Sequence, residues 1–197
     1  MDNRIKAKEG DMQSQDMQRQ IFQDLASEAF WLRVENRALL YRVVRGEVKQ
    51  SLNRPDELEK FTNRKDPIVK RIVGEELTIT PDMPEELVKE LVKVAEKLTE
   101  DAPMADSKYA CPDWFATAGL AENTNIESDI FGKLAEKLSR YRHWRVQTVL
   151  IANPNTPTMI REQLKKDNAE LLDELGKLSD SGAMEEFFGL MEFLLRH

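Results

Sequence analysis

Cysteine and long apolar runs are scarce in this chain of 197 residues. Its single cysteine, Cys111, excludes an internal disulfide and any zinc or iron–sulfur site that needs several cysteines. The longest uninterrupted apolar run has four residues, at Val149–Ala152, whereas a helix that crosses a bilayer needs about 20. The first 20 residues carry charges of both signs and contain no apolar signal-peptide core. We therefore expect a cytoplasmic protein that spans no membrane and holds no metal or cofactor.

Sequence motifs for catalysis are also lacking. The two histidines, His143 and His197, lie 54 residues apart, and the chain has no HExxH motif, no glycine-rich phosphate loop and no GxSxG motif. Cys111 would need a base from elsewhere in the fold to act as a nucleophile. Under the 30-residue repeat, His143 takes the position of Asp113, two residues after Cys111. Stacked repeats bring many such residue pairs close together, so this proximity does not indicate a catalytic pair. We therefore expect no catalytic residue and a protein that is not an enzyme.

Apolar residues recur at spacings of three and four along most of the chain, which is typical of amphipathic helices, and no segment alternates like a strand. The spacing from Ile21 to Val48 suits one long helix or two abutting ones. Prolines and asparagines separate further predicted helices over residues 68–77, 85–99, 114–121, 128–140, 142–152, 158–177 and 183–196. The predicted fold class is therefore all-α.

Internal repeats give the most informative signal in the sequence. A shift of 30 residues superposes Trp114 on Trp144, Leu120 on Leu150, Asn123 on Asn153, Asn125 on Asn155, Ile130 on Ile160 and Leu134 on Leu164. A shift of 73 residues adds an earlier copy, with Leu77 on Leu150 and Leu91 on Leu164. Each copy has a helix, a tight loop and a second helix. Because one such helix pair cannot bury its apolar face alone, we expect consecutive copies to stack.

The loop of the last copy contains residues that end one helix and begin the next. Asn153 tolerates the left-handed conformation in which many helices end, and Pro154 cannot continue a helix. Thr156 has a hydroxyl suited to cap the following helix, with Pro157 at the first helical position. We therefore expect a helix cap on each side of this loop.

The stretch from Trp144 to Pro157, WRVQTVLIANPNTP, followed by Ile160 and Leu164, resembles one unit of the leucine-rich repeat variant and of related HEAT-like bacterial helical repeats. The family positions compared are the Val-Arg pair, the pattern Ala-x-Asn-Pro-x-Thr-Pro and the later leucines. Of the pattern, this stretch contains Asn153, Pro154, Thr156 and Pro157, with Ile151 at the alanine position. The resemblance is confined to residues 69–171. It implies a short right-handed α-solenoid used for binding, and it carries over no catalytic residue.

This interpretation divides the chain into six segments. They are a polar tail, an N-terminal helical region, a first repeat, a linker, two further 30-residue repeats and a C-terminal capping helix, over residues 1–18, 19–66, 67–101, 102–111, 112–178 and 179–197. The predicted architecture is a short right-handed α-solenoid of HEAT-like repeats with additional helices at both ends.

Charge is unevenly distributed along the chain, which has 36 acidic and 29 basic residues. Residues 31–73 and 130–166 have net charges of +5 and +6, whereas residues 74–101, 102–129 and 167–197 have net charges of −6, −4 and −6. Solvated helix faces produce such runs in many proteins, and a basic surface that meets a partner is the functional alternative.

The second helix of each copy would line the inner face of a solenoid, where polar side chains meet a partner. The candidate binding residues on these helices are Lys89, Lys93, Lys133, Lys137, Arg161 and Lys165. We predict a non-enzymatic protein–protein interaction module or adaptor whose partner has an acidic surface. An enzyme with a site assembled from acidic and basic residues far apart in the sequence is a less favoured alternative.

Residues 140–145 interleave cations with aromatic and imidazole rings, as in grooves that stack bases and neutralise phosphates. The cations are Arg140, Arg142 and Arg145, and an earlier basic cluster has Lys65, Lys70 and Arg71. A helical-repeat protein that binds nucleic acid through a basic stripe is therefore the alternative. Trp144 matches Trp114 in the repeat, which favours a packed tryptophan, and the adjoining acidic segments would repel nucleic acid.

The last predicted helix, over residues 183–196, has a broad apolar stripe that includes Phe187, Phe188 and Met191. One interpretation is a helix that caps the last repeat. The other is a face that docks a protein partner or forms a homodimer.

Overall fold

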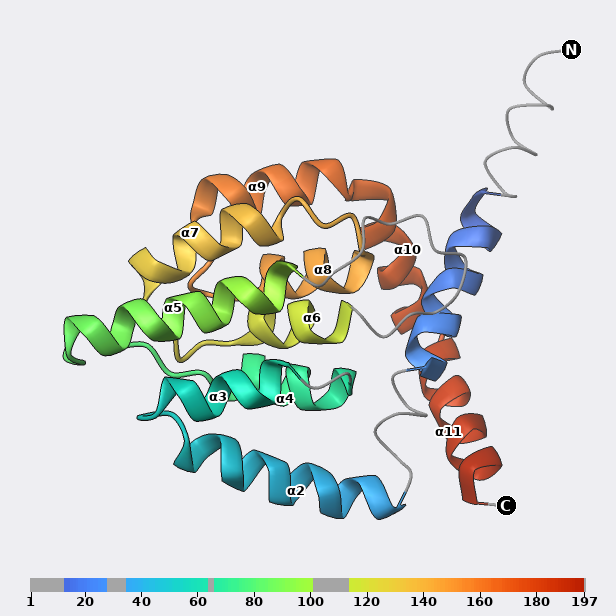
Figure 1. Cartoon of the computed structure of the whole chain (residues 1–197). Helices are drawn as coiled ribbons and strands as arrows, with labels where there is room; N and C mark the ends of the chain where they lie inside the picture. The colour runs from blue at the N-terminus through green and yellow to red at the C-terminus, as the bar shows by residue number, and fades with distance from the viewer. Residues whose placement is uncertain (1–12, 28–34, 64–65, 101–113, 197) are drawn as a thin grey trace, which may run out of the picture. The chain divides into compact units, whose positions relative to one another are not determined.

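The computed structural model describes residues 13–27, 35–63, 66–100 and 114–196, although not the side chains of residues 35–41, 100, 188 and 191–196 (Figure 1). A helix over residues 13–27 comes first. The helices that follow are α2 (Glu35–Gln50), α3 (Pro55–Thr62), α4 (Pro67–Glu76), α5 (Glu85–Glu100), α6 (Trp114–Glu122), α7 (Ser128–Leu138), α8 (Trp144–Ala152), α9 (Thr158–Asp167), α10 (Ala169–Asp180) and α11 (Ala183–Arg196). The all-α prediction is thus confirmed for the described residues, which contain no strand beyond one isolated bridge.

The chain forms two compact units. The main unit contains residues 38–167, and the terminal unit contains residues 1–37 together with residues 168–197. The terminal unit therefore contains both ends of the sequence, which the predicted division assigns to separate segments. The helix over residues 13–27 also begins inside the predicted polar tail.

The main unit has α4, α6 and α8 as neighbours, with α6 between the other two. Every residue of α6 from Trp114 to Ala121 is buried, which explains why this helix is apolar all round. α5 packs against α6 and α7, and α9 packs against α8, so that α5, α7 and α9 follow one another on one side of the unit (Figure 1). α3 contacts α4 and α5. First and second helices of the predicted copies thus lie in different layers.

α4 and α6 approach each other so closely that their backbones touch at two glycines. A Cβ atom on Gly119 would lie 2.6 Å from the carbonyl oxygen of Arg71, and a Cβ atom on Gly74 would lie 2.8 Å from the backbone nitrogen of Leu120. Both distances are shorter than atoms tolerate, and the obstructing atoms belong to backbone rather than to flexible side chains. The spacing of α4 and α6 therefore depends on glycine at both positions.

For the helices predicted from residue 68 onward, the ends agree with the prediction to within two residues, with one exception. The helix predicted over residues 158–177 is interrupted at Asn168, which has φ −114° and ψ 24° and separates α9 from α10. Asparagine competes with helical hydrogen bonding through its short amide side chain, so it is weak in a helix interior. The break falls where the main unit ends and the terminal unit resumes.

Asn153 is the C-cap residue of α8, as predicted, and its backbone N–H donates to the carbonyl of Val149, but the predicted conformation of this cap and the predicted cap at Thr156 are wrong. Asn153 has φ −70° and ψ 122°, which is extended rather than left-handed. The hydroxyl of Thr156 is buried and has no hydrogen-bond partner, so it does not cap α9, which begins at Thr158. The asparagine instead acts through its side chain, as described in the next subsection.

Within the terminal unit, polar and aromatic contacts join the helix over residues 13–27 to α10 and α11. Nε2 of Gln18 donates a hydrogen bond of 2.8 Å to Oε2 of Glu174, and the ring of Phe22 lies 4.8 Å from that of Phe187. Nζ of Lys177 lies 2.8 Å from Oε1 of Glu174. Hydrogen bonds to Glu174 from Lys177, Gln18 and Ser14 lower the pKa of its carboxyl to about 2.

Replacing Gly119 by alanine should destabilise the protein although alanine favours helices. The added Cβ meets the Arg71 carbonyl, and overpacking of this kind costs about 1–3 kcal/mol in the free energy of unfolding. The control is Gly46→Ala in α2, where nothing lies within 4 Å and helix propensity alone should add about 1 kcal/mol. Chemical denaturation of both variants measures the difference, and equal effects would contradict the close contact.

The depressed pKa of Glu174 predicts acid sensitivity. A carboxyl that is more acidic in the folded state than its usual value of 4.5 stabilises the fold above that pH, and this stabilisation disappears as the pH falls to about 2. Denaturation across this pH range should therefore show a steeper loss of stability for the wild type than for Glu174→Gln. Parallel pH profiles for the two proteins would show that the carboxylate is not held in this way.

Candidate interaction surface

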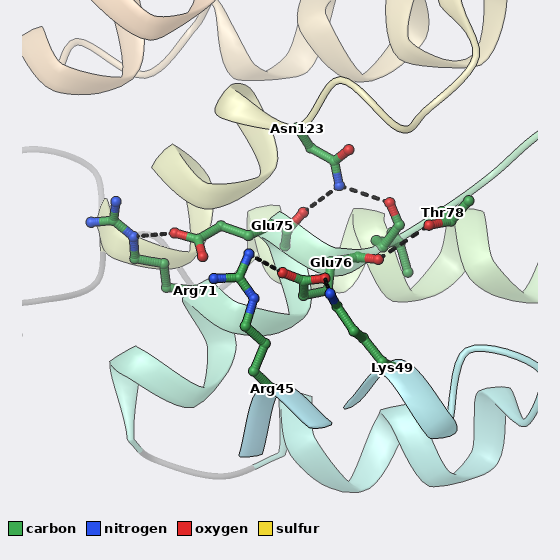
Figure 2. Close-up of polar contacts among 9 residues, drawn as sticks. Arg45, Lys49, Arg71, Glu75, Glu76, Thr78 and Asn123 are labelled. Carbon is green, nitrogen blue, oxygen red and sulfur yellow. Dashed lines mark hydrogen bonds and ion pairs between the residues drawn. The ribbon is translucent and has the colours of Figure 1, made fainter. Parts of the chain in front are cut away.

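Asn123, in the loop after α6, joins this loop to the end of α4. Its Nδ2 donates to the carbonyl oxygens of Gly74 and Leu77 at 2.6 and 2.8 Å (Figure 2). Its Oδ1 accepts a hydrogen bond of 2.7 Å from the backbone nitrogen of Asn125. The side chain is 3% exposed, so its amide replaces water for two carbonyls that the helix leaves unpaired.

Asn153, 30 residues later, joins its own loop to the one before in the same manner. Its Nδ2 donates to the carbonyl oxygens of Ala121 and Asn123 at 2.7 and 2.9 Å, and its Oδ1 accepts from the backbone nitrogen of Asn155 at 2.9 Å. Nδ2 of Asn155 then donates to the carbonyls of Thr124 and Ile126 at 3.1 and 3.0 Å. We call Asn123, Asn153 and Asn155 the asparagine ladder.

Backbone pairing adds to the ladder between the first two loops. The nitrogen of Ile79 donates to the carbonyl of Asn125 at 3.2 Å, and the nitrogen of Glu127 donates to the carbonyl of Ile79 at 2.9 Å. Because these loops lie side by side, the helices that follow them begin at one edge of the main unit. These contacts between the loops place α5, α7 and α9 on a common side of the main unit.

A second network of charged side chains links α4, α6 and α8. Nε of Arg71 lies 2.7 Å from Oε1 of Glu75, and its Nη2 lies 3.4 Å from Oε2 of Glu122. Glu122 also pairs with Arg145 at 3.4 Å. Arg71 is buried, with its guanidinium 5.8 Å above the ring of Phe115. The proposal that Arg71 belongs to an exposed basic stripe is therefore wrong.

Glu76, at the end of α4, is a buried carboxylate that receives two cations from α2. Arg45 and Lys49 both pair with it, the latter at 3.2 Å (Figure 2). Val44 and Val48 of the same helix are buried as well. These contacts hold α2 against the main unit, and they explain why an acidic residue occupies the inner face of α4.

Most candidate cations on the second helices have an acidic partner close by. Lys89 pairs with Glu85, Lys93 with Glu90, Lys165 with Glu162 and Arg140 with Glu136, each three or four residues away on its own helix or next to it. Lys137 pairs with Glu96 of α5 at 2.6 Å, and Lys97 of α5 pairs with Glu59 of α3 at 2.9 Å. The surface formed by these helices therefore carries both signs of charge in close alternation.

Equivalent positions of the copies also differ in charge. The position of Lys133 is occupied by Glu90 in the earlier copy and by Gln163 in the later one. Lys133 and Arg142 are exposed, and among the described residues neither forms an ion pair. These two residues are the members of the predicted cation set that remain available for an acidic partner.

The rings in the run 140–145 are used within the fold. The hydroxyl of Tyr141 donates to the carbonyl of Thr99. The ring of His143 stacks on that of Trp114 at 4.6 Å, and its Nδ1 accepts a hydrogen bond of 3.3 Å from the backbone nitrogen of Arg145 at the start of α8. The rings of Tyr141 and His143 in this run are therefore explained by their contacts within the fold, without a bound nucleic acid.

Arg161 differs from the other candidates because its guanidinium contacts backbone. Nη2 lies 3.2, 3.0 and 2.8 Å from the carbonyl oxygens of Asn153, Pro154 and Thr156. The sequence contained a signal for this role, since Arg161 aligns with Phe131, which is buried, and not with an exposed position of α7.

The remaining predicted residues are only partly described. Phe187 contacts Phe22, while the side chains of Phe188 and Met191 lie outside the described part of the chain, as do Lys65 and Cys111. Leu190, next to this stripe, is 57% exposed. The described residues include no group of three or more His, Cys, Asp and Glu side chains that could hold a metal. Across the same ranges, no helix has the length and apolarity needed to cross a bilayer.

Replacing Asn123 by alanine should lower the free energy of unfolding by about 2–3 kcal/mol, because two buried carbonyls lose their donor. The control is Asn125→Ala in the same loop, whose exposed side chain should contribute less than about 0.5 kcal/mol. Urea denaturation of both variants gives the comparison. A small effect at Asn123 would mean that water satisfies these carbonyls equally well.

Comparison of the chain with models of protein families, with curated proteins and with solved structures gave no match.

Proposed function

We propose that the chain is a non-enzymatic protein–protein interaction module built on three stacked helix pairs, α4–α5, α6–α7 and α8–α9. The observation that carries this proposal is the equivalent placement of Asn123 and Asn153, each of which ties its loop to the preceding helix pair. This repetition supports a short right-handed solenoid of HEAT-like units. Such arrays use their extended surfaces for binding.

The binding surface in this proposal is the side formed by α5, α7 and α9, with α7 in the middle. Its paired lysines contribute little to the free energy of binding, because each would break an exposed ion pair in the protein to form a similar weak pair with the partner. Lys133 and Arg142 have no such pair to give up among the described residues. An acidic segment of a protein partner therefore gains most at these two cations.

A protein partner is favoured over nucleic acid for two reasons. Tyr141 and His143 already make contacts inside the fold and are not free to stack on bases. The acidic residues Glu85, Glu90 and Glu136 lie among the lysines and would repel a phosphate backbone. An acidic peptide needs only a few cations, whereas nucleic acid requires a continuous row.

The double variant Lys133→Glu/Arg142→Glu tests this function. Its free energy of unfolding should stay within about 0.5 kcal/mol of the wild type, because both side chains are exposed. In nuclease-treated extracts of the cells that make the protein, it should fail to capture the acidic proteins that the wild type captures, as measured by mass spectrometry. The matched control, Lys93→Glu/Lys165→Glu, reverses two paired lysines and should retain capture.

Two outcomes would contradict the proposal. If the folded double variant captured the same proteins as the wild type, the binding surface would not include Lys133 and Arg142. A gel shift with nucleic acid that weakens by orders of magnitude between about 50 and 200 mM salt would instead support the nucleic-acid alternative.

A further inference from the structure

The loop between α6 and α7 has three carbonyl groups that depend on the next copy. The carbonyl oxygen of Asn123 accepts from Asn153, and those of Thr124 and Ile126 accept from Asn155. Both donors are side-chain amides from the loop that follows 30 residues later. A further copy would have to supply the same donors to the loop between α8 and α9.

The sequence does not supply them. Thirty residues after Asn153 and Asn155 the chain has Ala183 and Glu185, and neither side chain can donate a hydrogen bond when the glutamate is ionised. The carbonyl groups equivalent to those of the earlier loop belong to Asn153, Pro154 and Thr156. Asn153 and Thr156 are 4% and 2% exposed, whereas Pro154 is exposed, so two of these three residues have poor access to water.

Arg161 contacts all three of these carbonyls. Its Nη2 lies 3.2, 3.0 and 2.8 Å from the oxygens of Asn153, Pro154 and Thr156. These acceptors match Asn123, Thr124 and Ile126 one for one under the 30-residue shift. In the preceding loop two asparagines bond to four carbonyls, of Ala121, Asn123, Thr124 and Ile126. Nη2 of Arg161 shares its two N–H groups among the equivalents of the last three, from within the same copy.

The helix that contains Arg161, α9, has the features of the last helix in a repeat array. Arg161 occupies the position of Phe131, which is buried in α7, and Lys165 occupies the position of Ala135, which is also buried. In α9 Lys165 is exposed and Arg161 is only partly buried. Polar residues on the outer face are typical of the last unit of a repeat array.

We infer that Arg161 is the residue that ends the asparagine ladder, by satisfying the carbonyl groups of the last loop from within its own helix pair. The inference assigns Arg161 to positioning of the 153–156 loop rather than to partner binding. It rests on the equivalence of the two loops and not on the identity of any partner, so the capture experiment above can fail without affecting it.

The test compares Arg161→Met with Lys165→Met by amide hydrogen exchange of the full chain. Loss of the guanidinium should lower protection about tenfold at the amides of Asn155 and Thr156, which bond to Asn153 in this loop. Protection at Asn125 and Glu127 in the preceding loop should stay unchanged, because Asn153 and Asn155 still occupy its carbonyls. Lys165→Met removes a charge from the same helix and should alter neither loop.

Unchanged protection at Asn155 and Thr156 in Arg161→Met would overturn the inference. So would an equal loss in both loops, since that would indicate a general role in stability. Arg161→Lys keeps the cation and provides the same comparison if the methionine variant is too unstable to measure. A smaller loss confined to the 153–156 loop is then expected, because an ammonium group cannot reproduce the planar guanidinium.

Discussion

The close contact of α4 and α6 is the constraint on which the main unit depends. With glycine at positions 74 and 119, the two backbones approach until a Cβ atom would collide with a carbonyl or an amide. At this separation the side chain of Asn123 reaches from its loop to the carbonyls of Gly74 and Leu77. The same separation brings Glu122 within reach of Arg71. A larger side chain at either glycine would therefore disturb packing and both polar networks together.

The two networks have different physical characters. The asparagine ladder uses neutral, buried amides that bond to backbone carbonyls, so its strength does not depend on ionic strength. The network of Arg71, Glu122 and Arg145 uses charges, and it joins the middle of α4 to the end of α6 and the start of α8. The neutral amides position the loops. In the charged network, the carboxylates of Glu75 and Glu122 balance the charge of the buried Arg71.

The sequence predicted the helices, and their ends, well because proline, asparagine and apolar spacing are local signals. The 30-residue shift also identified Asn123 and Asn153 as equivalent. It did not predict the hydrogen bonds of their side chains, because a cap is a local structure whereas the acceptors of Asn123 lie 46 and 49 residues away and those of Asn153 lie 30 and 32 residues away. For the same reason the exposed role predicted for Arg71 failed, because its partner Glu122 is 51 residues away. Partners at such separations follow from tertiary packing, which periodicity does not specify.

The ion pairs that join α5 to α3 and to α7 make this side of the main unit sensitive to salt. Glu59 and Lys97 connect α3 to α5, and Glu96 and Lys137 connect α5 to α7, all of them at partly exposed positions that salt screens. On the opposite side, α4 and α6 are fixed by backbone contact and by neutral hydrogen bonds. Salt therefore weakens the electrostatic part of the contacts among α3, α5 and α7, whereas the contact of α4 with α6 does not depend on it. The loss of stability on adding salt should stay small, because exposed ion pairs contribute at most about 1 kcal/mol each.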